Sequence, residues 1–176
     1  YVQLAGKRYV IRDGKKFMAA ARKTPMVDGS GLKNTLERKC IMDIQRDGTY
    51  DLRGKEVLMV SGVDRFGMAE AFEEAGAKLT IGDLIYTIGV PIPLRTLKTL
   101  RIVGRLLAPI IVRMPFDMLY PTGEKQEVII PKFSKYYYNA DVLAGDFNYI
   151  KRYLPENLQG KIVITNTTAK DDLVLL

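Results

Sequence analysis

The segment 62–83 contains the residues whose types and spacing are best suited to chemistry. Gly62 and Gly67 bracket a tight turn, and the helix expected to start near Arg65 would present unpaired N–H groups to a pyrophosphate. Asp83 follows Gly62 by about 20 residues, a spacing at which a carboxylate can accept hydrogen bonds from ribose hydroxyls. These residues predict a dinucleotide site, and Asp83 favours NAD over NADP because it would repel a 2′-phosphate.

One position of this turn departs from the usual glycine pattern. Asp64 stands where a middle glycine is expected, and it adds a side chain and a negative charge where the phosphates would approach. Arg65 is expected to offset that charge, and Gly67 to let the helix pack closely on the preceding strand. A turn that binds another ligand, or none, is the alternative.

The sequence around the turn predicts the elements that would position these residues. Residues 56–60 form a short apolar run, which is typical of a strand buried on both faces of a parallel sheet. Apolar residues recur at helical spacing over residues 68–75, and residues 78–82 read as a second strand that ends at Asp83. This order predicts a nucleotide-binding βαβ unit.

Two later segments resume the same alternation. Residues 140–146 and 161–165 are expected to be strands, with Asp146 and Asn166 at their carboxyl ends. Ligands of a doubly wound sheet lie outside the carboxyl ends of its strands, so we count Asn166 among the cofactor-binding residues. The predicted fold is therefore α/β, a Rossmann-like doubly wound, mostly parallel sheet.

The remaining segments define the expected domain organisation. Residues 47–176 would form the nucleotide-binding domain, with residues 84–139 as a helical insertion. Residues 1–46 would end a preceding unit and supply a linking helix with apolar residues four apart. These apolar residues are Leu32, Leu36, Cys40 and Ile44. Because the sequence has no initiator Met and starts and stops within apparent elements, we expect it to be a piece of a longer chain.

A longer pattern connects these elements to a known family. The segment Asp28-Gly29-Ser30-Gly31 precedes a long helix, and Asp51-Leu52-Arg53-Gly54-Lys55 leads into the strand and its glycine turn. Over about residues 26–83 this order resembles the middle of the shikimate and quinate 5-dehydrogenases. The phrases VDGSGLKNTLER and YPTGEKQE are similar to bacterial proteins labelled quinate 5-dehydrogenase.

The resemblance implies an NAD(P)-dependent oxidoreductase that moves a hydride between a cyclic polyol and the nicotinamide. It places on Asp28 an acid/base role beside a lysine, and Lys15, Lys16 and Lys23 are the lysines that most closely precede it in the sequence. The polar loop of residues 120–127 offers Lys125 for contact with a polyhydroxylated or anionic substrate, and we name it with Asp28 as catalytic. The alternatives are a helix N-cap for Asp28 and an exposed turn for Lys125.

Composition narrows the chemistry further. The chain of 176 residues has a formal charge of +7, which would favour anionic partners. It has no histidine and a single cysteine, which excludes histidine-based metal sites, histidine general bases and an internal disulfide. We therefore predict no metal site, and a reducing, cytoplasmic location.

The predicted insertion contains a cationic stripe. The helix expected over residues 94–107 places four cations three or four residues apart: Arg95, Lys98, Arg101 and Arg105. We expect this to be the solvated face of a packed or dimer-forming helix, which predicts a homo-oligomer. Nucleic acid and membrane surfaces are less favoured partners, since the stripe lacks interleaved aromatic residues.

Two other functions fit the same elements. One is a non-catalytic, Rossmann-like nucleotide-binding or assembly protein that uses the cationic helix as its partner surface. The other is a methyltransferase-like use of the βαβ unit with S-adenosylmethionine as cofactor.

Overall fold

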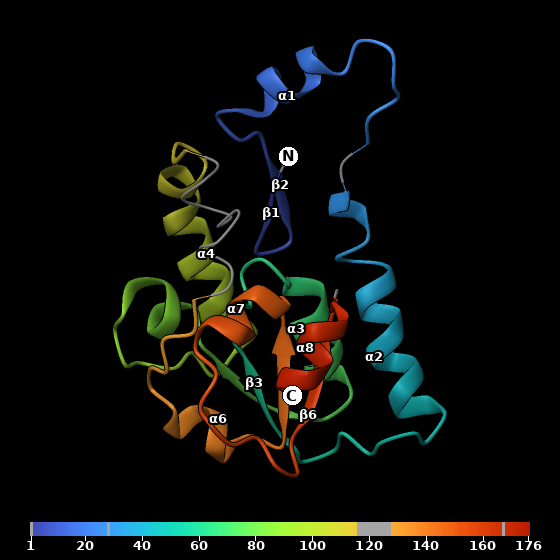
Figure 1. Cartoon of the computed structure of the whole chain (residues 1–176), viewed down its shortest axis with the longest axis vertical. Coiled ribbons are helices and arrows are strands. Elements are labelled where there is room, and N and C mark those ends of the chain that lie inside the picture. The colour runs from blue at the N-terminus through green and yellow to red at the C-terminus, as the bar shows by residue number, and fades with distance from the viewer. Residues whose placement is uncertain (1, 28, 116–127, 167) are drawn as a thin grey trace.

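The structure is a computed structural model that describes residues 2–27, 29–115, 128–166 and 168–176. Its centre is a sheet of four parallel strands: β3 (Glu56–Met59), β4 (Lys78–Ile81), β5 (Val142–Gly145) and β6 (Ile162–Thr165). The strands lie in the order β4-β3-β5-β6. The predicted strands are confirmed, and the fold is α/β with a parallel sheet (Figure 1).

Helices cover both faces of this sheet. Successive residues of β3 point to opposite faces, so Val57 and Met59 join one core and Leu58 joins the other. The first core includes residues of α2 (Leu36–Arg46), α3 (Phe66–Glu74) and α4 (Leu97–Ile111). The second includes residues of the π-helix η2 (Asp83–Ile88), α6 (Lys135–Asn139) and α7 (Phe147–Arg152). The sheet is therefore buried on both faces, as its apolar runs predicted.

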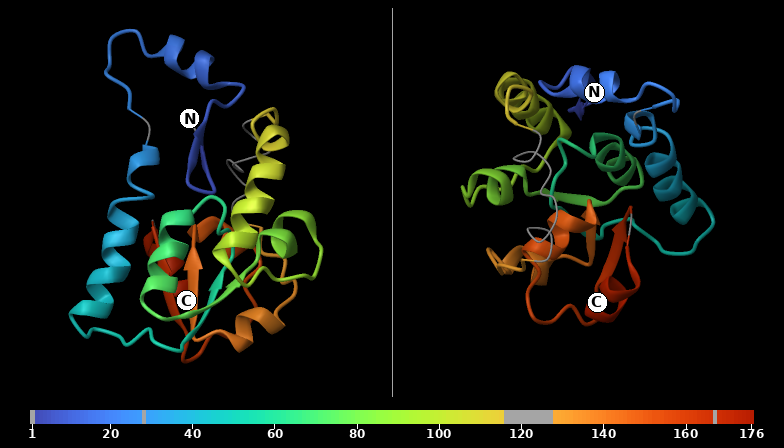
Figure 2. Two further views of the ribbon diagram at one scale, coloured as in Figure 1. Left: turned by 180° about the vertical axis from the view of Figure 1, so that it is seen from behind. Right: turned by 45° about the horizontal axis from the view of Figure 1, so that its top comes forward.

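A β-hairpin lies above the carboxyl edge of the sheet (Figures 1 and 2). Its strands are β1 (Val2–Leu4) and β2 (Lys7–Tyr9), joined by a two-residue turn in which both φ angles are positive. The backbone N–H of Ala5 in this turn donates to the carbonyl of Val63 at 2.9 Å. The hairpin is thus attached directly to the turn that follows β3.

The remaining elements lie at the two ends of the chain. Helix α1 (Gly14–Ala20) buries none of its residues and lies at the end of the molecule farthest from the sheet (Figure 1). It is followed by the short 3₁₀ turn η1 (Gly29–Gly31), which leads to α2. Helix α8 (Lys170–Leu175) follows the last strand. Among the described residues, no helix combines the length and hydrophobicity that a membrane-spanning segment requires.

Two details of the predicted helices were wrong. Helix α2 begins at Leu36, and the side chain that it buries is Ile41, whereas Leu36 and Cys40 are exposed. Leu94 is extended and forms an antiparallel bridge with Ile81, so the insertion helix starts only at Leu97. Thr96 caps this helix by accepting the N–H of Thr99.

Candidate functional site

The strand order identifies the place where a ligand is most readily bound. The chain passes from β3 to β4 on one side and then returns to β5 on the other side of β3. Ligands of open α/β sheets lie outside the carboxyl ends of the strands at such a reversal. The turn after β3 and the turn after β5 meet here.

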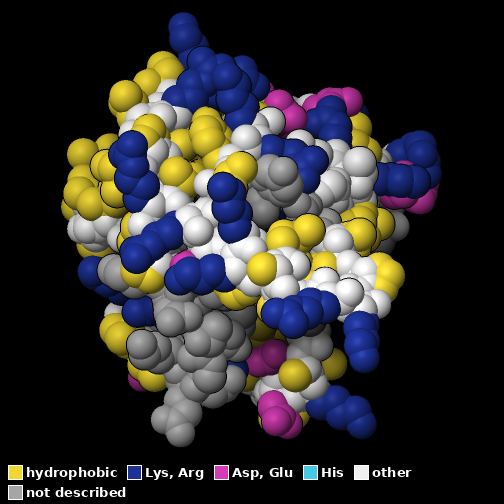
Figure 3. All heavy atoms as spheres, turned by 90° about the horizontal axis from the view of Figure 1, so that it is seen from above, with side chains coloured by type: hydrophobic (Ala, Val, Ile, Leu, Met, Phe, Trp, Pro, Cys, Tyr) yellow, Lys and Arg dark blue, Asp and Glu magenta, His cyan; other side chains and the backbone are white. Residues whose placement is uncertain are grey.

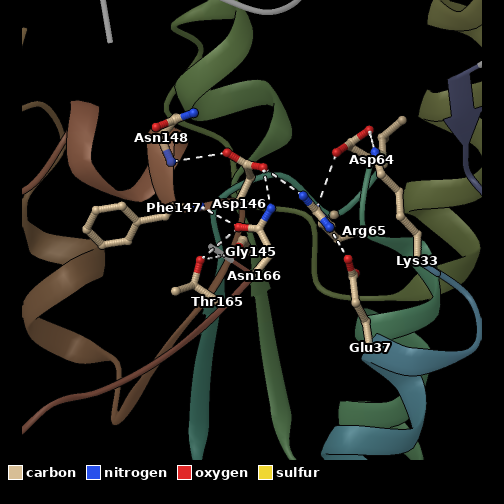
Figure 4. A network of polar contacts seen from close by, with 12 residues as sticks. Lys33, Glu37, Asp64, Arg65, Gly145, Asp146, Phe147, Asn148, Thr165 and Asn166 are labelled. Carbon is tan, nitrogen blue, oxygen red and sulfur yellow. Dashed lines mark hydrogen bonds and ion pairs between the residues drawn. The ribbon is translucent and has the colours of Figure 1, made fainter. Parts of the chain in front are cut away.

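Arg65 connects these two turns. Its Nη2 donates to Oδ2 of Asp146 at 2.7 Å, and its Nη1 donates to Oε1 of Glu37 on α2 (Figure 4). The Arg65 side chain is only 6% exposed, and its Nε lies 3.5 Å from Asp64 Oδ2. Arg65 therefore forms ion pairs with three carboxylates that come from different segments of the chain.

Two further contacts complete this group, which we call the charged network: Lys33, Glu37, Asp64, Arg65, Asp146 and Asn166. Lys33 Nζ donates to Asp64 Oδ1 at 2.5 Å, and Asn166 Nδ2 donates to Asp146 Oδ2 at 3.1 Å (Figure 4). The network joins the segment before α2, the N-terminus of α3 and the ends of β5 and β6. Both of its cations are already paired with carboxylates.

Asp83 makes a separate contact with the turn after β3. Its Oδ2 accepts the N–H of Gly62 at 2.8 Å, and its Oδ1 accepts the N–H of Val63 at 2.9 Å. Burial raises the pKa of this carboxyl to about 6, while the two amide hydrogen bonds act in the opposite direction. Two amides of the predicted phosphate turn therefore donate to a carboxylate of the chain itself.

The balance of charge at this edge is acidic. The network and Asp83 together contain four carboxylates and two cations. Carboxylates in excess of cations repel an anion, and they attract a cation or accept hydrogen bonds from an uncharged ligand. The arrangement therefore favours ligands without negative charge.

A cavity of about 620 Å³ opens beside the network. Apolar side chains of four different segments line it, namely Val2, Ile11, Leu36 and Met68. Glu37, Arg65 and Asn166 contribute polar groups to the same wall. We call this the larger cavity; its volume is within the range of small-molecule sites.

Glu37 is a polar side chain of this wall with unused hydrogen-bonding capacity, and Arg65 Nε is a second buried atom without a hydrogen-bond partner among the described residues. Oε1 of Glu37 accepts from Arg65, but its Oε2 is buried and has no hydrogen-bond partner among the described residues. Burial raises the pKa of the Glu37 carboxyl, and Arg65 lowers it. A hydroxyl or amine that donated to Oε2 would satisfy this buried oxygen.

The structure brings together some of the predicted site residues. Arg65 and Asn166 both contact Asp146, as expected from the strand ends, and Asp64 lies next to them. Gly62 and Asp83 are in contact with each other but do not line the larger cavity. The predicted catalytic residues Asp28 and Lys125 lie outside the described residues.

Gly62 lies in the turn after β3 as expected, whereas Gly67 has a different role from the one expected. A Cβ on Gly67 would lie 2.7 Å from the carbonyl oxygen of Lys33 and from Asn34 Oδ1. The expectation that Gly67 packs against the strand was therefore wrong, because it packs against the segment before α2. A Cβ on Gly62 would lie 2.9 Å from Ile81 Cγ2, so glycine is needed there for close packing.

Sequence reasoning missed Lys33 and Glu37. Both belong to the segment that was interpreted only as a linking helix. Their four-residue spacing does place them on one side of a helix, which is the one signal that could have indicated a shared role. That they face Asp64 and Arg65 depends on tertiary packing.

The comparison with protein families gives a single assignment. The model of a domain of unknown function, DUF8754, matches residues 31–176, so the chain belongs to this family. The matched residues include all four strands of the parallel sheet and the whole charged network. No curated protein and no solved structure matches the chain significantly.

Proposed function

We propose that the chain is a Rossmann-like ligand-binding domain whose larger cavity takes a small molecule with an apolar body and a hydrogen-bond donor. The ligand is uncharged or cationic. The observation that carries this proposal is the pairing of both network cations while Glu37 Oε2 has no partner among the described residues. Such a wall offers an acceptor and has no unpaired cation for an anionic group.

The apolar part of the wall supports the same ligand class. Leu36 is 54% exposed although it is a large apolar side chain, and it lies on the cavity together with Ile11 and Met68. A ring or short chain packed there would remove this apolar surface from water. The donor of the ligand would then face Glu37.

Three probes that share one ring test the proposal: cyclohexanol, cyclohexylammonium and cyclohexanecarboxylate. In ¹H–¹⁵N NMR titrations of the full chain, we expect the alcohol and the ammonium to shift the amides of Leu36 and Glu37. The carboxylate should bind at least about tenfold more weakly, because both cations of the wall are already paired with carboxylates and Glu37 would repel it. Equal binding of all three probes, or tighter binding of the carboxylate, would contradict the proposal.

A matched pair of variants locates the site. Leu36→Trp would fill the cavity and should abolish the shifts, whereas Leu173→Trp makes the same change on α8, outside the cavity lining. Leu173 is 65% exposed, so the second variant should bind as the wild type does. Loss of binding in both variants would mean that the probes bind elsewhere.

A second candidate function is the NAD(P)-dependent dehydrogenase. The observation that favours it is that Gly29 and Ser30, which follow Asp28 directly, line the same cavity as Arg65 and Asn166. A substrate in this cavity would therefore contact the two residues that follow the predicted catalytic aspartate in the sequence, together with two predicted cofactor-binding residues. The substrate of this candidate is a cyclic polyol and its cofactor NAD, or NADP.

Calorimetry with NAD and NADP separates the two candidates. Saturable NAD binding that weakens in Asp83→Ala would support the dehydrogenase, and Asp28→Ala should then lower turnover about 10²–10⁴-fold with the fold intact. If Asp28 is only an N-cap, the variant should instead lose about 0.5–2 kcal/mol of stability. Absence of binding to both cofactors would exclude the dehydrogenase.

A further inference from the structure

The end of the molecule farthest from the sheet has a concentrated positive charge (Figure 1). Residues 7–23, which include β2 and α1, contain a single acidic residue, Asp13, and it forms an ion pair with Lys16. The same residues include seven exposed cations: Lys7, Arg8, Arg12, Lys15, Lys16, Arg22 and Lys23. We call residues 7–23 the N-terminal segment. A dense charge of one sign attracts a surface of the opposite sign.

Exposed apolar side chains lie in the middle of this charge. Phe17 and Met18 of α1 are 42% and 60% exposed, and α1 buries none of its residues. Successive residues of a helix are about 100° apart, so these two side chains lie on the side of α1 opposite Lys15 and Lys16. On the face seen from above, apolar side chains lie among Lys and Arg side chains (Figure 3). This division of apolar and cationic sides is typical of helices that lie in a membrane interface.

Backbone hydrogen bonds attach the N-terminal segment to the rest of the domain. The hairpin that contains β2 is bonded to the turn after β3 through Ala5, as described above. The N–H of Arg12 donates to the carbonyl of Val112, at the end of α4, at 3.0 Å. Arg113, which is exposed, follows Val112 and adds a further cation beside the segment. The cations and the apolar pair therefore belong to one folded surface.

We propose that the N-terminal segment docks on an anionic lipid bilayer. Phe17 and Met18 enter the interfacial layer, and the surrounding cations contact the lipid headgroups. The charge of the segment complements an anionic surface, and its exposed apolar pair favours a bilayer over a nucleic acid. The phosphates of a nucleic acid would bind the cations, but they offer no acyl layer for the apolar pair.

The proposal differs from two others made for this chain. It does not depend on the ligand of the larger cavity, because neither Phe17 nor Met18 lines that cavity. It also does not involve the cationic stripe of α4, which has no aromatic residue among its cations, whereas the N-terminal segment has Phe17.

Cosedimentation of the full chain with lipid vesicles tests the proposal. The vesicles consist of phosphatidylcholine, either alone or with about one lipid in three replaced by phosphatidylserine. We expect saturable binding that is at least about tenfold tighter with phosphatidylserine, and that weakens as added salt screens the attraction. Equal binding to both vesicles, or binding to neither, would overturn the proposal. Binding of duplex DNA without binding of vesicles would assign the segment to a nucleic acid instead.

A matched pair of double variants tests the apolar contact. Phe17→Ser with Met18→Ser should weaken vesicle binding at least about tenfold. Leu173→Ser with Val174→Ser makes a similar change on α8, where both side chains are also exposed, and should bind as the wild type does. Because α1 buries no residue, the first variant should keep the melting temperature of the wild type. Wild-type binding by the α1 variant would overturn the proposal.

A second matched pair tests the charge. Lys15→Gln with Lys16→Gln should weaken vesicle binding at least about tenfold. Lys98→Gln with Arg105→Gln removes two exposed cations from α4 instead, and should have a clearly smaller effect. If the α4 variant lost as much binding as the α1 variant, or more, the N-terminal segment would not be the docking surface.

Discussion

The charged network and the surface of α4 have opposite balances of charge. The network and Asp83 together contain four carboxylates and two cations, of which Arg65 is buried and Lys33 is partly buried. On and beside α4, Arg95, Lys98 and Arg105 are exposed and make no ion pair among the described residues. On the face seen from above, Lys and Arg side chains are more frequent than Asp and Glu side chains (Figure 3).

The net charge of the sequence describes the exterior surface of the protein, but it does not predict the charge of the site. The formal charge of +7 led to the expectation of anionic partners, and that expectation applies to the exterior. The site at the carboxyl edge has the opposite sign, and a sum over the sequence does not reveal it. The predictions below test whether substitutions in the two regions also differ in their effect on the stability of the protein.

The largest effect is expected from Arg65→Met. Removal of this cation leaves three buried or partly buried carboxylates without their shared partner, which should cost about 3–5 kcal/mol of unfolding free energy. The matched variant on α4 is Arg105→Met, an exposed position where the change should stay within about 0.5 kcal/mol. Urea denaturation of both variants measures the two losses of unfolding free energy. Similar losses would contradict the prediction.

Asp83→Asn should change the pH dependence of stability. The pKa of Asp83 is raised from 3.8 to about 6, so its stabilising contribution is complete below about pH 4 and is lost as pH rises through 6. Since one pKa unit corresponds to about 1.4 kcal/mol, the wild type should lose up to about 3 kcal/mol relative to the variant. Denaturant unfolding at a series of pH values measures this difference, and a constant difference would contradict the shift.

Gly67→Ala should perturb the network without removing any charge. The added Cβ would meet Lys33 O and Asn34 Oδ1 at 2.7 Å, so α3 must move away from the segment that carries Lys33. Overpacking of this kind costs about 1–3 kcal/mol. Gly31→Ala is the control, because nothing lies within 4 Å of its Cβ and its φ is not positive. The two melting temperatures should differ, and equal values would show that α3 tolerates the methyl group.

The smallest effect concerns the outer side of α4. Ile102, Leu106 and Ile110 recur every four residues and are at least half exposed. Leu106→Ser should change stability by less than about 0.5 kcal/mol, whereas it should weaken self-association if α4 forms the predicted homo-oligomer. Sedimentation at several concentrations distinguishes these effects, and unchanged association would exclude α4 as the interface.

The fold could be predicted from local patterns because its strands are short apolar runs with a turn at each end. β3, β4, β5 and β6 lie where those runs predicted. The helix starts were less predictable. The apolar spacing does not decide where this helix begins. Pro93 and the Thr96 cap keep Leu94 beside β4 and place the start of the helix after it.

The site was less predictable than the fold for a physical reason. The partners of Arg65 are Glu37 and Asp146, which are 28 and 81 residues away, and no local pattern connects them. The sequence correctly placed Asp83 at the end of a strand. Which N–H groups donate to its carboxylate depends on how closely the end of β4 approaches the turn after β3. The excess of carboxylates over cations at the carboxyl edge of the sheet follows from these two tertiary arrangements.

The arrangement of Arg65 also has a consequence for the order in which the chain is made. Translation runs from the N-terminus, so Glu37 and Arg65 emerge from the ribosome well before Asp146 does. Until residue 146 is available, neither β5 nor the last carboxylate of the network can take its place beside β3. Until then the edge of β3 that pairs with β5 has no partner strand, and unpaired strand edges of this kind make folding intermediates prone to aggregation.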